Sequence, residues 1–200
     1  MTTKMNADSM DLTDDYAFTG AVTGAGGGAW TMIGTAVAST SSSLTITGLD
    51  STYDTYAIAL SDFKPSGDGT NMHLRVGDSG GIETGSVYNY HTNLLAPGST
   101  AYAGEVGLDV TVWRPSPAAG VGNATAESYG GLFYIHQPMD STGNTIISGT
   151  YVGHLAAGTM IGGTFVGSMK NVQVVTQVQF LPNSGTLISG RMTVWGISHA

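Results

Sequence analysis

Short runs of alternating apolar and polar residues, separated by turn residues, dominate the chain from Ala29 onwards. Met72, Leu74 and Val76, for example, alternate with His73 and Arg75. Successive side chains of a β-strand point to opposite sides of a sheet, so this spacing predicts a half-buried strand. The same reasoning predicts strands over 30–33, 43–47, 56–60, 86–92, 107–113, 131–136, 145–152 and 159–166. Apolar residues nowhere follow helical spacing for three turns, so we expect negligible helix.

The most regular alternation lies near the C-terminus. Valine and phenylalanine alternate with glutamine through residues 172–180, and a second strand is expected over 187–197. The loop 182–185 between them, Pro-Asn-Ser-Gly, has the length of a hairpin connection. We therefore expect these two strands to be antiparallel neighbours.

Many short strands, glycine-rich turns and no crossover helices predict an all-β fold. The expected architecture is an antiparallel β-sandwich that is jelly-roll-like, the form common in viral proteins. The 30 glycines fit many tight turns, because glycine takes positive φ without steric cost. A length of 200 residues suits one sandwich with an appended segment, and we place the sandwich domain at 29–200.

Residues 1–28 have a different pattern. Tyr16, Phe18 and Val22 alternate with small residues, and the run Gly-Ala-Gly-Gly-Gly follows at 24–28. This predicts an N-terminal arm, a short strand on a flexible hinge that adds to the sheet edge of a neighbouring subunit through those three side chains. The alternative is a tail without fixed structure, since termini are mobile unless something holds them.

Charge is scarce throughout the sequence. Charged residues make up 10% of the chain, against roughly 25% in an average soluble domain. Small neutral residues must cover the surface instead, which is understandable if an assembly buries much of it. The net charge is −8, and the six lysines and arginines never cluster, so we expect no binding to nucleic acid.

The sequence offers few candidates for chemistry. It has no cysteine, which removes disulfides, thiolate zinc sites and cysteine nucleophiles. Its five histidines occur singly, without the spacing of a zinc site. Asp50, Asp54 and Asp62 carry oxygen ligands but lack the spacing of a calcium loop, and the simpler interpretation is that Asp50 and Asp54 bond to amides of their own turn. We expect neither a metal nor a cofactor.

Two features of the sequence bear on catalysis. The segment 77–81, Gly-Asp-Ser-Gly-Gly, matches the surroundings of a serine-protease nucleophile, but His73 is the single histidine before Ser79, so a glycine-rich turn is the simpler interpretation. A glycan depolymerase needs two carboxylates at the bond that is cleaved. Nothing in the sequence brings together any two of the three glutamates, Glu83, Glu105 and Glu127. We therefore expect no enzyme activity.

The N-terminal residues lack the apolar stretch of a signal peptide, and no apolar run is long enough to span a membrane. We expect a protein that is made in a reducing cytoplasm and does not bind membranes. Three tryptophans, Trp30, Trp113 and Trp195, offer a stacking platform for sugars, although Trp30 and Trp195 also suit a core or an interface.

Three separated blocks resemble bacteriophage virion surface proteins. They are Asp15–Gly20, the stretch from Gly48 through Tyr56 to Met72-His-Leu-Arg75, and Ile188–Ile197. Such proteins are described as tail fibre, minor tail or capsid decoration proteins. The resemblance implies a virion surface subunit and carries no catalytic residues.

These observations predict a capsid decoration (cement) protein that stabilises the particle through subunit contacts. We expect it to assemble with itself, as a trimer, and to bind the major capsid protein or another virion protein. The alternative is a tail fibre or spike module that binds host-surface glycans through exposed aromatic residues. Both place the chain in the virion.

Overall fold

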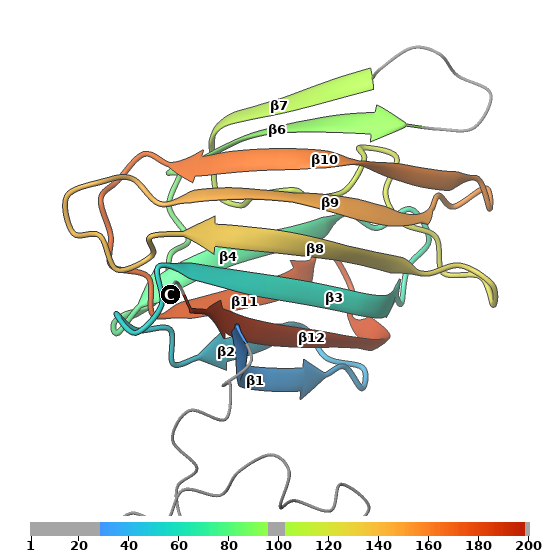
Figure 1. Ribbon diagram of the computed structural model, residues 1–200. Coiled ribbons are helices and arrows are strands. Elements are labelled where there is room, and N and C mark those ends of the chain that lie inside the picture. Colours follow the sequence, from blue (N-terminus) through green and yellow to red (C-terminus); the bar gives the residue numbers. More distant parts are fainter. Residues whose placement is uncertain (1–28, 96–102, 199–200) are drawn as a thin grey trace, which may run out of the picture.

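The computed structural model describes residues 29–95 and 103–198, which form twelve β-strands and no helix (Figure 1). The strands are β1 (Trp30–Val37), β2 (Leu44–Thr47), β3 (Thr55–Pro65), β4 (Met72–Asp78), β5 (Gly81–Ile82), β6 (Tyr88–Leu95), β7 (Ala103–Val110), β8 (Tyr129–His136), β9 (Ile146–His154), β10 (Met160–Met169), β11 (Gln177–Pro182) and β12 (Leu187–Ile197). All named strand pairs are antiparallel. The predicted all-β class is confirmed.

The strands form two sheets. The larger has eight strands in the order β1-β12-β3-β8-β9-β10-β6-β7, and the smaller has four in the order β2-β11-β4-β5. Figure 1 shows β2, β11 and β4 lying behind the larger sheet. The predicted antiparallel β-sandwich is therefore present within the described residues.

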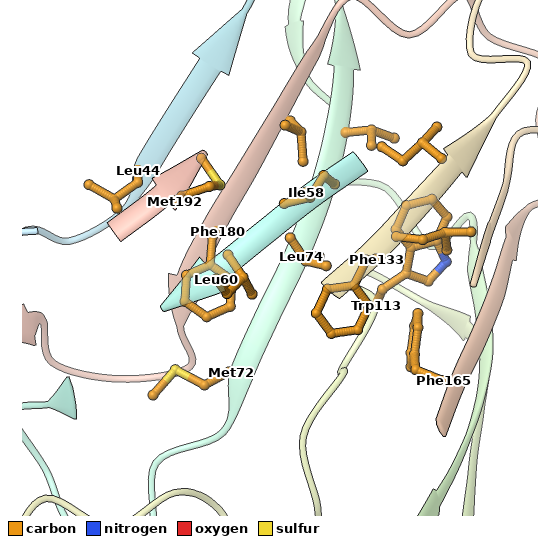
Figure 2. Close-up of a cluster of buried hydrophobic side chains, with 14 of the residues drawn as sticks. Leu44, Ile58, Leu60, Met72, Leu74, Trp113, Phe133, Phe165, Phe180 and Met192 are labelled. Carbon is orange, nitrogen blue, oxygen red and sulfur yellow. The ribbon is translucent and has the colours of Figure 1, made fainter. Parts of the chain in front are cut away.

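The core lies between the two sheets and follows from the alternation of each strand. Phe180 of β11 points inward and meets Phe63 of β3, with ring centroids 4.5 Å apart, and it stacks on Tyr129 of β8 at 6.2 Å. Figure 2 shows Phe180, Leu60, Ile58 and Leu74 together in this cluster. Full burial of each such side chain contributes roughly 1.5–3 kcal/mol to folding.

The segment 111–128 extends the smaller layer beneath β6 and β10. Trp113 exchanges backbone hydrogen bonds with Leu74 of β4, at 2.9 and 3.0 Å. Its buried indole donates from Nε1 to the carbonyl oxygens of Asn89 and Ser168, at 3.1 and 3.3 Å. A Cβ at Gly167 would lie 2.8 Å from that Nε1, so the strand needs glycine there to accept the ring.

Most predicted strands are present, with shifted ends. The strand expected over 107–113 is β7 at Ala103–Val110, and the one expected over 172–180 begins at Gln177. The two-residue strand β5 was not predicted, because the sequence pattern indicated only a glycine-rich turn over 77–81. The predicted arm, residues 1–28, lies outside the described residues.

The expected hairpin between the last two strands is wrong. β11 pairs with β2 and β4 in the smaller sheet, whereas β12 pairs with β1 and β3 in the larger one. The loop between them crosses from one sheet to the other. Alternation shows which side of a strand is buried, but it cannot tell a neighbour within one sheet from a strand of the facing sheet.

Candidate interaction surface

The side of the eight-stranded sheet that points away from the smaller sheet is here called the outer face. Strand register places one residue of every strand in a single row across it, which we call the central row: Met32, Trp195, Ala57, Tyr134, Ser148, Val166, His91 and Val106. The central row contains no aspartate, glutamate, lysine or arginine. This is unusual for a solvated sheet surface, where charged side chains are common.

A second row, beside the central row, also lacks these four residue types: Thr35, Thr193, Ala59, Leu132, Thr150, Thr164, Asn93 and Gly104. On the other side lies a third row over seven strands: Trp30, Ile197, Thr55, His136, Ile146, Ser168 and Asn89. Arg191 and the Lys170–Asp109 ion pair, at 2.6 Å, lie outside these rows. The middle of the outer face is therefore neutral apart from any charge on His91 and His136.

Exposed apolar side chains concentrate on this outer face. Of the twelve large hydrophobic residues that are exposed among those described, ten belong to it: Trp30, Met32, Val37, Leu95, Val106, Leu108, Ile146, Val152, Met160 and Val166. Val172 and Ile188 are the other two. Scattered exposed hydrophobic residues are ordinary, whereas a concentration on one face marks an interaction surface.

Aromatic rings gather on the outer face near β1. Trp30 packs on Trp195 with ring centroids 6.0 Å apart and meets Tyr134 edge-on at 6.2 Å. Ala57, which lies between Trp195 and Tyr134 in the central row, is fully buried although it belongs to the outer face. Trp30 itself remains 42% exposed. The Trp30 ring is inclined by 56° to Trp195 and by 86° to Tyr134, so the cluster is a ridged aromatic patch that can contact a sugar or another protein.

A shallow depression of about 360 Å³ lies at the opposite end of the outer face, between β10, β6 and β7. Its wall is mostly apolar, with Val106, Leu108 and Val166 around His91. Tyr90 also lines it, and burial raises the pKa of this phenol. The Arg114 guanidinium lies 5.8 Å from the centre of the Tyr90 ring. The depression can accept an apolar side chain, but it holds no carboxylate.

The smaller sheet has a polar exterior. Gln179 of β11 lies between Thr45 of β2 and Arg75 of β4, and its amide donates to the Thr45 hydroxyl at 3.2 Å. Arg75 donates from Nε to the carbonyl oxygen of Thr111 at 3.1 Å. Burial, together with the nearby Arg114 and Arg75 charges, lowers the pKa of His73 to about 4. The hydrogen bonds of this exterior are largely made within the chain.

The motifs that suggested chemistry make local hydrogen bonds within their own turns. The segment 77–81 is a tight turn between β4 and β5, in which Asp78 accepts a bond from the Gly80 amide at 2.7 Å. Asp50 accepts from the Thr52 amide at 2.8 Å, as expected, and this bond lowers the pKa of the Asp50 carboxyl. The Asp54 carboxylate accepts no such bond from the described residues. Within 29–95 and 103–198, no three histidine, aspartate or glutamate side chains gather as for a metal.

The three glutamates each bond to nearby groups. Glu83 accepts from the Gly85 amide at 2.6 Å, and Glu127 accepts from the Ala124 amide at 2.7 Å. Glu105 forms an ion pair with Arg114 and accepts from the Ala118 amide at 2.6 Å. These contacts give each carboxylate a role in holding its own loop or strand.

The predicted interface residues Tyr16, Phe18 and Val22 lie outside the described residues. Of the three tryptophans considered for a sugar platform, Trp113 is buried in the core, whereas Trp30 and Trp195 come together on the outer face. Sequence reasoning missed the outer face as a whole. Its signal was present in strands such as β10, where apolar residues occupy both sides, as in Phe165 and Val166.

No helix in the described part of the chain has the length and apolar character needed to cross a membrane. Comparisons with protein-family models, with curated proteins and with solved structures found no match for this chain.

Proposed function

We propose that this chain is a structural subunit of a virus particle, a capsid decoration (cement) protein whose outer face packs against neighbouring subunits. The observation that carries the proposal is the outer face itself, which combines ten exposed large hydrophobic residues with rows free of formal charge. Such a surface can be desolvated at little electrostatic cost, because no ion has to leave water.

The strand order also supports a jelly roll, the finer architecture that we expect for a virion protein. Pairs are nested along the chain: β1 with β12, β2 with β11, β3 with β8 and β4 with β5. This nesting is that of a long hairpin folded over into two sheets, which is how a jelly roll is wound. In this interpretation β6, β7, β9 and β10 are additions that widen one sheet.

The size of the outer face suits a stable contact. Eight strands span roughly 35 Å and an eight-residue strand runs roughly 27 Å, so the face covers roughly 900 Å². A standard protein interface uses about 800 Å² on each partner. The proposed partners are other copies of the chain, as a trimer, and the major capsid protein or another virion protein. Several modest contacts of this kind stabilise a shell through avidity, without any chemistry.

The test compares binding to expanded capsids that lack the protein. Val166 lies in the middle of the outer face and is 52% exposed, so Val166→Lys should fold normally yet place a charge in the contact. Thr47→Lys is the matched control, because Thr47 is exposed on β2 of the smaller sheet. We expect Val166→Lys to lose cosedimentation with capsids and Thr47→Lys to keep it. A wild-type protein that stays monomeric and never binds capsids would refute the proposal.

The aromatic cluster on the outer face favours a second function, a tail fibre or spike module that binds host glycans. Trp30, 42% exposed, packs on Trp195 and Tyr134, and a single exposed indole of this kind can stack on a sugar ring. A glycan array with the wild type and Trp30→Ala separates the two functions. Glycan binding that disappears in Trp30→Ala favours the tail module, whereas cross-linking to the major capsid protein favours decoration.

A further inference from the structure

The strand β7 ends the eight-stranded sheet, with β6 as its single neighbour among the described strands. Its register with β6 is regular from Gly104 to Gly107 and shifts only beyond that point. An antiparallel strand with one neighbour leaves every second backbone N–H and C=O on its other side without a partner in the sheet. β7 therefore offers a regular edge to which another strand can bind.

β7 lacks two of the usual protections of an edge strand, although its register shifts beyond Gly107. Residues 103–110 contain no lysine and no proline, the two residues that most often prevent edge pairing. Its two acids are both neutralised, since Glu105 pairs with Arg114 and Asp109 pairs with Lys170. Leu108 and Val106 are also the two most exposed large hydrophobic residues described, at 69% and 63%.

The other sheet ends are less suitable as acceptors. In the smaller sheet, β2 has four residues and β5 has two, so each offers few backbone groups. At the far end of the larger sheet, the register between β1 and β12 shifts within the strand, between Met32 and Gly34. This shift interrupts β1 after its first three residues, whereas the shift between β6 and β7 leaves β7 regular from Ala103 to Gly107 and so gives it the longer uninterrupted edge.

We propose that β7 accepts the segment 16–22 of a second copy of the chain as an additional strand of its sheet. The inference rests on the proposed function, in which copies of the chain assemble. The segment alternates Tyr16, Phe18 and Val22 with small residues, which is the pattern of a strand with one apolar side. Beside β7, those three side chains would add to the exposed apolar surface of Val106 and Leu108.

Geometry requires the donor to be another copy. The segment enters the structure at β1, and β1 and β7 lie at opposite ends of the eight-stranded sheet. A strand added beyond β7 is eight strand spacings, or roughly 38 Å, from β1. The eight residue steps from Val22 to Trp30 span at most roughly 28 Å when fully extended. A chain therefore cannot reach its own β7, and the contact links successive subunits, as a closed ring such as a trimer requires.

Cross-linking between two single-cysteine variants tests the proposal, and the absence of native cysteine keeps the test clean. Full-length Phe18→Cys is mixed with affinity-tagged Leu108→Cys and treated with a short thiol-specific crosslinker. We expect a covalent product that contains both variants. Met32→Cys replaces Leu108→Cys in the matched control, because Met32 is 62% exposed on β1 at the other end of the same face, and it should give no product with Phe18→Cys.

Three results would overturn the inference. A product between Phe18→Cys and Met32→Cys alone would place the segment at the wrong edge. Efficient cross-linking of Leu108→Cys to itself would show that two β7 strands pair. Oligomers or capsid-bound subunits that give no Phe18–Leu108 product would refute this contact while leaving the proposed function intact. A monomer that binds no capsid would instead refute the proposed function.

Discussion

The outer surfaces of the two sheets are built on the same alternating pattern but carry different side chains. Outside the smaller sheet, β11 presents glutamines beside Thr45 and Arg75, and these groups bond to one another or to nearby carbonyl oxygens. Outside the larger sheet, β9 and β10 present Ile146, Val152 and Val166, which no part of the described chain covers. The exterior of the smaller sheet carries polar groups that suit contact with water, whereas the exterior of the larger sheet carries exposed apolar side chains that suit contact with a partner.

This difference shows what alternation can and cannot reveal. The buried side of each strand resembles that of the others, because both sheets contribute to one core. The outward side differs with what it must face, so the residues between the core positions distinguish a solvated surface from a contact surface. A strand whose outward residues are valine, isoleucine and methionine predicts a partner, even when its inward residues predict only a fold.

The comparison assumes one shared core, and Phe180→Ala tests that assumption with the largest expected effect. Phe180 is fully buried in β11 and contacts Phe63 and Tyr129 of the facing sheet. Its truncation should lower the free energy of unfolding by about 3–5 kcal/mol, through lost burial and a residual cavity. Denaturant unfolding measures this change. A loss below about 1 kcal/mol, typical of surface sites rather than core sites, would show that the two sheets do not pack as described.

A pH titration tests the polar exterior of the smaller sheet. The pKa of His73 is lowered to about 4 by burial and by the nearby Arg114 and Arg75 charges. The unfolded chain, with an ordinary histidine pKa near 6.5, therefore binds the proton more readily than the folded chain. Stability from this group should be complete above about pH 6.5 and fall as the pH drops towards about 4, by about 1–2 kcal/mol after allowance for solvent screening.

His73→Asn isolates that contribution. The unfolding free energy of the wild type minus that of His73→Asn, measured from pH 8 to pH 4, should fall as the pH falls. The value at pH 8 gives the packing cost of the substitution alone. A difference that stays constant with pH would show that this part of the polar exterior is open to water.

Trp30→Ala tests the aromatic cluster on the outer face of the larger sheet, with a smaller expected effect on the free energy of unfolding. Trp30 contacts Trp195 and Tyr134, so its loss should lower the free energy of unfolding by about 1 kcal/mol, the size of one or two aromatic pairs. Met32→Ala is the control, since Met32 lies on the same strand with 62% of its side chain exposed. Equal effects of the two substitutions would contradict the role given to the cluster.

The smallest expected effect concerns the monomer alone. Val152→Lys on β9 should change the unfolding free energy of the dissociated chain by no more than about 0.5 kcal/mol, because Val152 is 54% exposed. Thr47→Lys on the smaller sheet should do the same. A large loss of monomer stability in Val152→Lys would mean that the outer face is part of the folding core rather than a surface for partners.

The sequence predicted local features well and spatial ones poorly. The alternation of Met72, Leu74 and Val76 correctly predicted β4, since side-chain periodicity is a local property. The separation of β11 from β12 depends on contacts with strands far away in the chain, so a short loop suggested the wrong neighbour. The position of Trp113 beneath β6 and β10 depends on contacts of the same long-range kind.

For the candidate site, sequence reasoning led to Tyr16, Phe18 and Val22, which remain predictions. It noted the low overall charge but not that formal charge is absent from the middle of one particular face. That requires the register of eight strands, because the central row combines residues from Met32 to Trp195 that no local pattern connects.

The most direct test of the outer face uses two methionines that it already contains. Met32 and Met160 are 62% and 54% exposed, and exposed methionine oxidises readily to the sulfoxide. Mass spectrometry after brief peroxide treatment compares their oxidation in capsid-bound and dissociated protein. We expect both residues to be oxidised in the free chain and protected in the assembly. Equal oxidation of Met32 and Met160 in the two states would contradict the claim that this face meets the partner.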